Sequence, residues 1–232
     1  VFSRRVDGQS DLYALNLTTG DLTQLTDTED DERSPTWSPD GTELAFVRIT
    51  PDLSDSVLLR TAYDNPEGVV PLEIGPYSPS QPVWSPDGCC IAYIWVTDIS
   101  QVFVFDLETK TSTSLVMTEG LAHVSPAWSP DGETIMFTGS VMNGARPLQL
   151  FEVEYAPGVT LNASTLSART AGEIGYQQAT IAPDGQLYAI RASDEFLVRV
   201  VEGEPPEVIV ALPVQSSVSF SPDGTRMMLS IE

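Results

Sequence analysis

The sequence has few positive charges, and this scarcity restricts what the protein can bind. Among 232 residues there are 11 Lys and Arg against 33 Asp and Glu, a formal net charge of −22. Nucleic-acid binding needs clustered cations for the phosphates, and anionic lipid surfaces attract proteins in the same way. The cations here stand singly, apart from Arg4-Arg5. We therefore expect neither nucleic acid nor an anionic membrane surface as a partner.

Long apolar runs are also missing. A membrane-spanning helix needs roughly 20 apolar residues, and the longest candidate, 208–220, is interrupted by Pro213 and by Gln215-Ser216-Ser217. No membrane insertion is therefore expected, although 41% apolar residues suffice to bury a core. The chain opens Val-Phe-Ser, with no Met and no charged-then-apolar leader, so we expect a mature or excised segment.

Cysteine and histidine are nearly absent. Cys89 and Cys90 are adjacent, and successive strand side chains point to opposite faces, so a bond between them would be strained and we expect free thiols. His123 is the only histidine, so no histidine cluster for a transition metal exists and acid–base chemistry would rest on one imidazole. The nucleophile elbow and both glycine-rich phosphate loops are missing. Catalysis by a pair of carboxylates remains an alternative, but we expect no enzyme, no cofactor and no metal.

A five-fold repeat dominates what is present. The aligned segments are SPTWSPDG (34–41), QPVWSPDG (81–88), SPAWSPDG (125–132), QATIAPDG (178–185) and SVSFSPDG (217–224). Their aspartates, at 40, 87, 131, 184 and 223, are 39 to 53 residues apart. Such a period, rich in β-branched and aromatic residues, indicates the blades of a β-propeller.

The strand and turn residues of each repeat predict a four-stranded sheet. In Ser-Pro-Asp-Gly, Pro fixes φ, Asp bonds its own backbone and Gly accepts positive φ, which predicts a tight turn between two strands. The strand before the turn carries Trp37, Trp84, Trp128, Ile181 or Phe220, and an alternating strand follows, as at 43–47 and 91–95. The clearest third strands are 11–17 and 101–107, and 22–26 is a typical fourth strand. Because large rings bury the most area between packed sheets, we expect the three tryptophans between blades and not on a sugar-stacking platform.

The pattern Pro-x-Trp-Ser-Pro-Asp-Gly, an alternating strand, then Leu-Tyr-x-x-Asn-Leu-Thr-Thr-Gly and Leu-Thr-x-Leu-Thr, resembles the TolB-type, WD-repeat-like β-propeller family over nearly the whole chain. The resemblance implies an all-β propeller of four-stranded antiparallel blades. It also implies relatives that are periplasmic and secreted interaction proteins, sensor domains of larger receptors, and propeller domains of some peptidases. The sequence departs from the pattern in its last two motifs, which lack Trp, and at Ala182, where the other motifs have Ser.

Five blades in a single domain over 1–232 are favoured if the two ends build one blade together. Joined head to tail, Asp223 and Asp40 are about 49 positions apart, within the spacing of the other repeats. However, 228–232 aligns with the same strand positions as 1–5, and two segments cannot occupy one strand. The alternative is a chain cut from a longer array, with the six blades that the resemblance implies.

The binding site is predicted on the loops that lead into the first strand of every blade, because such loops converge on one mouth of the channel. The residues assigned to this rim are Arg33, Ser34, Gln81, His123, Ser125, Tyr176, Gln177, Gln178 and Gln215. They offer many hydrogen-bonding groups and little charge, although ordinary solvated loops would look the same. We therefore predict a non-enzymatic scaffold or sensor domain that binds a protein or peptide, extracytoplasmic (periplasmic or secreted) or a soluble domain of a larger receptor. The alternatives are a small-ligand or sugar-binding propeller and the accessory propeller of an enzyme whose catalytic domain is absent.

The acidic run Asp27-Thr-Glu-Asp-Asp-Glu32 has oxygen ligands of the kind that calcium prefers, but it lacks the spaced Asp-x-Asp-x-Asp-Gly register. Runs of like charge are usually solvated loops, and we expect one here.

Overall fold

The computed structural model describes residues 1–52, 55–72, 74, 78–118, 120–141, 147–170, 172–214 and 218–229. Regular structure in this part of the chain is almost entirely β-strand, and its one helix is a short 3-10 turn, η1 (Ala163–Thr165). Within these ranges no helix has the length and apolar character needed to cross a membrane. The contacts divide the chain into an N-terminal unit (1–98 and 103–113) and a C-terminal unit (99–102 and 114–232).

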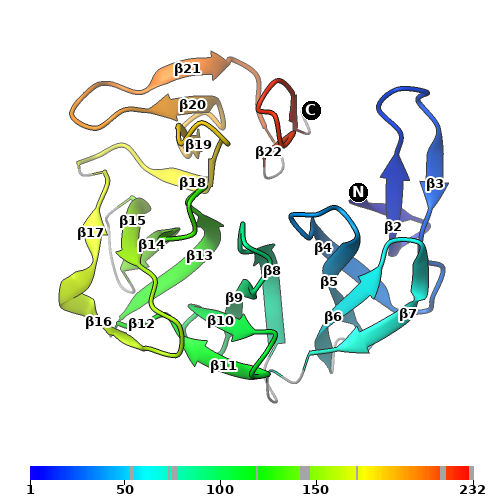
Figure 1. Cartoon of the computed structure of the whole chain (residues 1–232). Helices are drawn as coiled ribbons and strands as arrows, with labels where there is room; N and C mark the ends of the chain where they lie inside the picture. The colour runs from blue at the N-terminus through cyan, green and yellow to red at the C-terminus, as the bar shows by residue number, and fades with distance from the viewer. Residues whose placement is uncertain are drawn as a thin grey trace. The chain divides into compact units, whose positions relative to one another are not determined.

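The N-terminal unit contains one three-stranded sheet, one four-stranded sheet and most of a second four-stranded sheet (Figure 1). The first sheet has the order β1 (Phe2–Val6), β2 (Gln9–Leu15), β3 (Leu22–Gln24). The second has the order β4 (Asp31–Trp37), β5 (Glu43–Ile49), β6 (Ser56–Ala62), β7 (Asn65–Pro71). The third is built from β8 (Ser78–Trp84), β9 (Cys90–Val96), β10 (Gln101–Asp106) and β11 (Thr111–Ser114), of which 101, 102 and 114 count with the C-terminal unit.

The C-terminal unit contains two more four-stranded sheets. One is β13 (Leu121–Trp128), β14 (Thr134–Val141), β15 (Gln149–Glu154), β17 (Ser167–Ala168), and the other is β18 (Tyr176–Ile181), β19 (Leu187–Arg191), β20 (Leu197–Val200), β21 (Glu207–Val210). A short parallel ladder joins β12 (Val116–Met117) to β16 (Leu161–Asn162), and β22 (Ser219–Phe220) forms a hairpin with β23 (Met227–Met228).

These sheets confirm the predicted fold class, an all-β propeller of four-stranded antiparallel blades. The segments 42–48, 91–96 and 101–107, where a helix would have contradicted the prediction, contain β5, β9 and β10. The predicted conflict between the two ends is also present, because each end forms a second strand of its own. β1 pairs with β2 as β5 pairs with β6, and β23 pairs with β22 as β5 pairs with β4.

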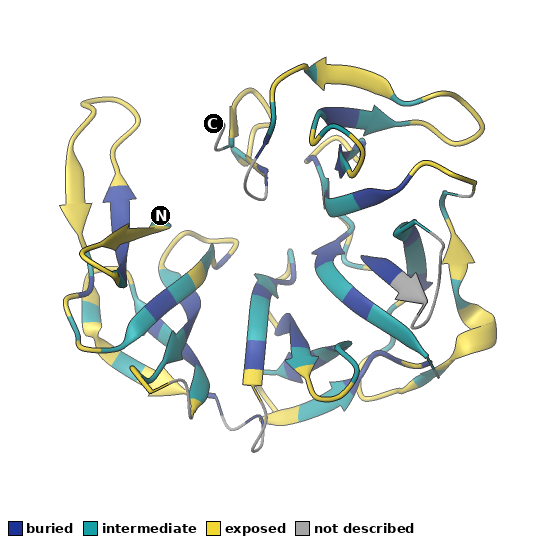
Figure 2. Cartoon of the chain, turned by 180° about the vertical axis from the view of Figure 1, so that it is seen from behind, coloured by how far each residue is buried: buried dark blue, intermediate teal, exposed yellow. Residues whose placement is uncertain are grey.

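Each unit has its core between neighbouring sheets. In the N-terminal unit Ala45, Leu58, Trp84, Ile91 and Tyr93 belong to one buried cluster. The corresponding cluster of the C-terminal unit is Met136, Leu150, Tyr176, Ala179, Leu187, Ala189 and Val198. The last strands β3, β7, β17 and β21 are mostly exposed, as Figure 2 shows.

The expected burial of the tryptophans holds for two of the three. Trp84 and Trp128 are each 7% exposed, whereas Trp37 is 38% exposed, so its predicted burial is wrong. Trp37 packs on Tyr63 with ring centroids 4.8 Å apart, as Trp128 packs on Tyr155, but Tyr63 is itself 38% exposed. The Trp–Tyr pair is therefore present in both sheets, but only Trp128 is buried.

The Ser-Pro-Asp-Gly turns join the first two strands of the sheets as predicted. In the turn after β4, the Ser38 hydroxyl donates to Asp40 Oδ1 (2.6 Å) and accepts from the Glu43 N–H (2.9 Å), and Asp40 accepts from the Thr42 N–H (3.0 Å). The turns at 85–90, 129–134 and 221–226 repeat these bonds. In the fourth repeat only the Asp184 bond to the Gln186 N–H remains, because Ala182 has no hydroxyl. This turn is also one residue shorter, since the Ala182 N–H donates to the Gln186 carbonyl four residues on, whereas the Ser38 N–H donates to the Glu43 carbonyl five residues on.

Neighbouring turns also touch. A Cβ added to Gly88, which has a φ of +76°, would lie 3.8 Å from Cδ of Pro39, and Gly224 meets Pro183 in the same way. The Pro of one turn thus packs on the Gly of the next at these two places, whereas Gly185 has no such neighbour.

Cys89 and Cys90 follow directly after the second of these turns. The structure joins them in a disulfide, so the expectation of free thiols is wrong. Cys90 is 1% exposed in β9, whereas Cys89 is at the surface.

Candidate functional site

The predicted rim residues lie within the first strands of the sheets, not on loops before them. The aligned rim consists of three successive residues in each first strand. The first of the three is buried in four sheets: Glu32, Pro79, His123 and Tyr176. His123 is 0% exposed and Tyr176 is 5% exposed, and burial raises the pKa of Tyr176. The prediction that these two side chains face a partner is therefore not supported by their positions, because neither offers surface.

The third position is a β-bulge in every one of these strands. Ser34, Gln81, Ser125 and Gln178 have φ values of +50° to +52°, and the strand register shifts around each of them. Two residues of the first strand oppose one of the second, so Ser34 and Pro35 face Phe46. Bulges re-aim side chains and concentrate near functional sites. The alignment identified these positions without indicating their backbone conformation.

The second and third positions are the accessible part of the predicted rim. Ser34 is exposed, and Gln81, Ser125, Gln177 and Gln178 are half-buried. The Arg33 side chain is 42% exposed and pairs with Asp31. Arg33, Ser34 and Gln81 belong to the N-terminal unit and the others to the C-terminal unit. Gln215 lies outside the described residues.

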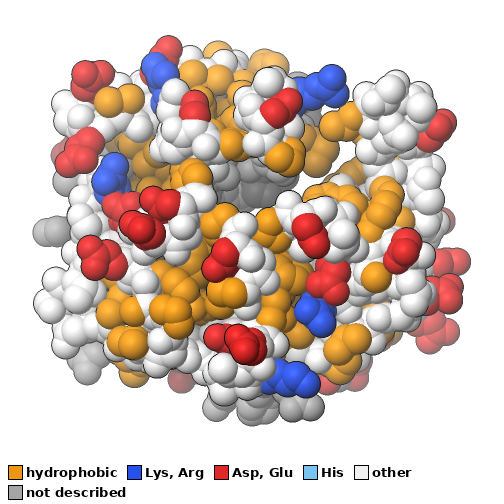
Figure 3. All heavy atoms as spheres, in the orientation of Figure 1, with side chains coloured by type: hydrophobic (Ala, Val, Ile, Leu, Met, Phe, Trp, Pro, Cys, Tyr) orange, Lys and Arg blue, Asp and Glu red, His pale blue; other side chains and the backbone are white. Residues whose placement is uncertain are grey.

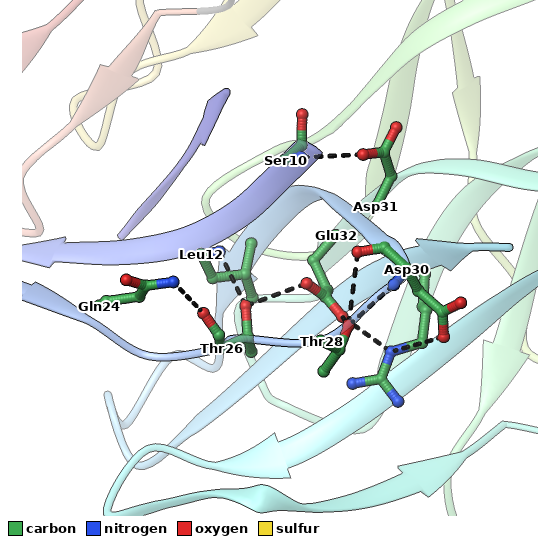
Figure 4. Close-up of polar contacts among 9 residues, drawn as sticks. Ser10, Leu12, Gln24, Thr26, Thr28, Asp30, Asp31 and Glu32 are labelled. Carbon is green, nitrogen blue, oxygen red and sulfur yellow. Dashed lines mark hydrogen bonds and ion pairs between the residues drawn. The ribbon is translucent and has the colours of Figure 1, made fainter. Parts of the chain in front are cut away.

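A buried carboxylate lies beside the first bulge. Glu32 is 0% exposed, and its two oxygens accept hydrogen bonds from Thr26 Oγ1 (3.1 Å) and Thr28 Oγ1 (2.6 Å). Arg48 at the end of β5 donates from Nε to Glu32 Oε1 over 2.9 Å. Figure 4 shows Thr26 and Thr28 converging on Glu32, while the Leu12 N–H of β2 donates to Thr26 Oγ1 (2.9 Å). The segment 26–32 is thereby fixed to both neighbouring sheets of the N-terminal unit.

Burial raises the pKa of Glu32, against the opposing effects of the Thr28 hydroxyl and the Arg48 guanidinium. The neighbouring Asp31 behaves differently. Its burial would raise its pKa, but the bond from the Ser10 N–H (2.8 Å) and the pair with Arg33 outweigh this and lower it. Much of the acidic run is therefore bonded to protein groups, and the expectation of a simply solvated loop is wrong for Asp31 and Glu32.

A cleft of about 470 Å³ opens next to this network. Its lining residues are Gln24, Leu25, Thr26, Asp27, Thr28, Arg48, Pro66, Glu67 and Val69. They come from β3 and the segment after it, from β5 and from β7, all in the N-terminal unit. The cleft could not be predicted from the sequence, because it depends on how the β6–β7 hairpin stands beside the segment 24–28.

His123 occupies the position of Glu32 in the C-terminal unit. Its Nδ1 accepts from the Val102 N–H (3.2 Å), so the proton of the neutral ring is on Nε2, which donates to Thr118 Oγ1 (2.7 Å). The ring stacks on Phe137 with centroids 4.2 Å apart. Burial lowers the pKa of His123 to about 4. At neutral pH this imidazole is uncharged, saturated and enclosed.

Acidic side chains are spread over the face shown in Figure 3, and basic ones are few. In the described ranges, no group of three or more His, Cys, Asp or Glu side chains is arranged to hold a metal ion.

Solved structures similar to this chain show the same fold. TolB from Acinetobacter baumannii has a TM-score of 0.74 at 16% identity and is matched over 94% of this chain and 53% of that chain. A putative TolB from Agrobacterium tumefaciens has a TM-score of 0.73 at 21% identity, over 93% and 75%. An oligogalacturonate lyase in complex with manganese has a TM-score of 0.68 at 14% identity, over 98% and 69%. No family model and no curated protein matches the sequence.

These likenesses define the fold as a β-propeller of the TolB type, in agreement with the resemblance of the repeat. The chain spans about half the length of the Acinetobacter structure.

Proposed function

We propose that this protein is a non-enzymatic β-propeller that binds a protein or peptide partner through the side chains around its first-strand bulges. We call Arg33, Ser34, Gln81, Ser125, Gln177 and Gln178 the bulge residues. The observation that carries the proposal is the left-handed backbone at the same register of four first strands. A non-glycine residue held in such a conformation costs on the order of 1–3 kcal/mol and is typical of binding and active sites.

The chemistry of these residues favours binding over catalysis. They present amide, hydroxyl and guanidinium groups, which recognise a partner by hydrogen bonds but include no general base near neutral pH. The only histidine is enclosed and has a pKa of about 4. An enzymatic role is the alternative, because one of the similar structures, an oligogalacturonate lyase, has the same fold.

An extracytoplasmic location belongs to the same proposal. The resemblance of the repeat to periplasmic and secreted interaction proteins supports it.

A photo-crosslinking amino acid at Ser34 or at Gln177 tests the binding role, because it labels only what touches those positions. We expect both probes to capture the same partner from an extract of the source cells. A probe at Asp40, at the exposed turn beyond the other end of β4, is the matched control and should not capture it. The variant Arg33→Ala/Gln81→Ala should reduce capture while the protein still folds, as its cooperative thermal unfolding would show. Equal capture by the Asp40 probe would place the binding surface elsewhere.

A further inference from the structure

The cleft in the N-terminal unit has the size of a small-molecule site. Ligand pockets are typically ~300–1,000 Å³, and this one is about 470 Å³. Leu25, Pro66 and Val69 supply an apolar part of its lining, and polar and charged side chains supply the rest. It therefore has the mixed lining that holds and orients a small ligand.

The guanidinium of Arg48 is a hydrogen-bond donor in the cleft that is available to a ligand. Arg48 uses Nε for Glu32, and Nε is also its closest nitrogen to Asp30, at 3.9 Å. Its two terminal nitrogens make no hydrogen bond with any described residue, and the side chain is 23% exposed. A guanidinium with both terminal nitrogens available binds a carboxylate in a two-bond fork. Glu32 itself is a positioning residue, because its oxygens are already occupied by Thr26, Thr28 and Arg48.

The free acceptors of the cleft require donors from the ligand. Asp27 and Glu67 are exposed, and neither makes a hydrogen bond or ion pair in the described part of the chain. The Gln24 amide donates to the Thr26 carbonyl (2.8 Å), which leaves its oxygen as a further acceptor. Two free carboxylates thus accompany one guanidinium whose charge Glu32 already offsets. A simple anion would be repelled, and a simple cation would leave the Arg48 fork unused.

We propose that this cleft binds a basic α-amino acid, free or as the carboxyl-terminal residue of a short peptide. The ligand carboxylate lies on the terminal nitrogens of Arg48, and its ammonium or guanidinium groups lie against Asp27 and Glu67. Its methylene groups pack on Leu25, Pro66 and Val69. This site does not rest on the proposed partner-binding function, because it uses none of the bulge residues.

Titration calorimetry on the whole chain with L-arginine as the probe tests the proposal. We expect saturable binding, which weakens at least tenfold with agmatine, because agmatine lacks the carboxylate. L-glutamate should bind at least tenfold more weakly than L-arginine, because its side chain is repelled by Asp27 and Glu67. D-galactose tests the remaining class of polar ligand. If galactose binds as well as L-arginine, the cleft is a sugar site and the proposal fails.

Two pairs of surface substitutions with equal charge change locate the binding. Asp27→Asn/Glu67→Gln should weaken L-arginine binding at least tenfold and leave the melting temperature unchanged, because neither carboxylate has a partner among the described residues. Glu108→Gln/Glu133→Gln removes the same charge from two exposed turn positions outside the cleft and should bind L-arginine like the wild type. Equal affinity of the two double variants, or no saturable binding by the wild type, overturns the site. Either result leaves cross-linking at Ser34 and Gln177 unaffected, so it does not bear on the proposed function.

Discussion

Glu32 and His123 stand at the same position of the first strand, one in each unit, and both are fully buried. Each is bonded to a threonine in the segment before its strand, Thr26 and Thr118 respectively. They differ in charge. Glu32 is paired with Arg48 beside an open cleft, whereas His123 is neutral and stacked on Phe137.

The difference shows that the same strand position can hold either a charged or a neutral buried side chain. A buried ion is tolerated only when hydrogen bonds and a counter-charge replace its water, and Glu32 has three donors. A buried imidazole avoids the problem by staying unprotonated. The charged solution leaves a guanidinium partly in contact with solvent, and with it a group that can bind a ligand. The neutral solution leaves nothing available.

The largest expected effect comes from leaving Glu32 without its counter-charge. Arg48→Met keeps most of the aliphatic stem and removes the guanidinium. Breaking a buried pair in this way typically costs about 3–5 kcal/mol. Because Arg48 is 23% exposed, we expect about 2–3 kcal/mol, measured by urea unfolding at pH 7. The double variant Glu32→Gln/Arg48→Met should recover more than half of the loss.

The pH dependence of the same variant sharpens the test. Burial raises the folded-state pKa of Glu32, and removing Arg48 raises it further. A raised carboxyl pKa contributes stability below the unfolded value of about 4.5, and this contribution is lost as pH rises through the folded pKa. The deficit of Arg48→Met should therefore shrink as pH falls toward 4.5. A deficit that stays constant would show that the lost stability comes from packing and not from the buried charge.

His123 should show the opposite sign. Its folded pKa of about 4 lies below the ordinary value of 6.5, so the unfolded chain takes up the proton first. The stability it gives is fully present above pH 6.5 and is lost as pH falls toward 4, by about 3 kcal/mol. Because many carboxylates titrate nearby, the measurement is the difference in unfolding free energy between wild type and His123→Gln across this range. A difference that does not narrow at low pH would mean that the ring is protonated in the native state.

The smallest expected effect concerns the turns, where the units agree. Ala182→Ser should restore the hydroxyl that donates to the turn Asp and accepts a backbone N–H in the other four turns. One such hydrogen bond is worth about 0.5–1.5 kcal/mol, so we expect a gain of this size in thermal or urea unfolding. Ser129→Ala should produce a loss of similar size. If Ala182→Ser destabilises, the fourth turn, which is one residue shorter than the others, has no room for the hydroxyl.

The fold could be predicted because its signals are local and repeated. The Pro, Asp and Gly of each turn act within a few residues, as the Ser38–Asp40–Thr42 bonds show, and five copies remove the ambiguity of one. The burial of Trp37 could not be predicted in the same way. Its motif matches that of Trp128, but the exposed fraction depends on what covers the ring from outside the repeat.

The backbone of the candidate site was harder to foresee. Ser34, Gln81 and Ser125 each precede a proline, and the residue before proline is normally restricted to extended conformations. The observed positive φ contradicts that local rule, so the tertiary structure imposes the bulge. The buried first positions were missed for a related reason. Three successive residues look alike in sequence, while the strand alternation turns Glu32 and His123 inward and leaves Arg33 outward.

The contacts between successive turns bear on how a repeat can be duplicated. Pro39 reaches Gly88 and Pro183 reaches Gly224, whereas a Cβ on Gly185 would meet nothing within 4 Å, so the contact forms at some repeat boundaries and not at all of them. A tandem copy inserted at a boundary that has the contact would bring both halves of its own interface. Arrays of this kind can therefore gain or lose whole repeats during evolution without the simultaneous change of two surfaces.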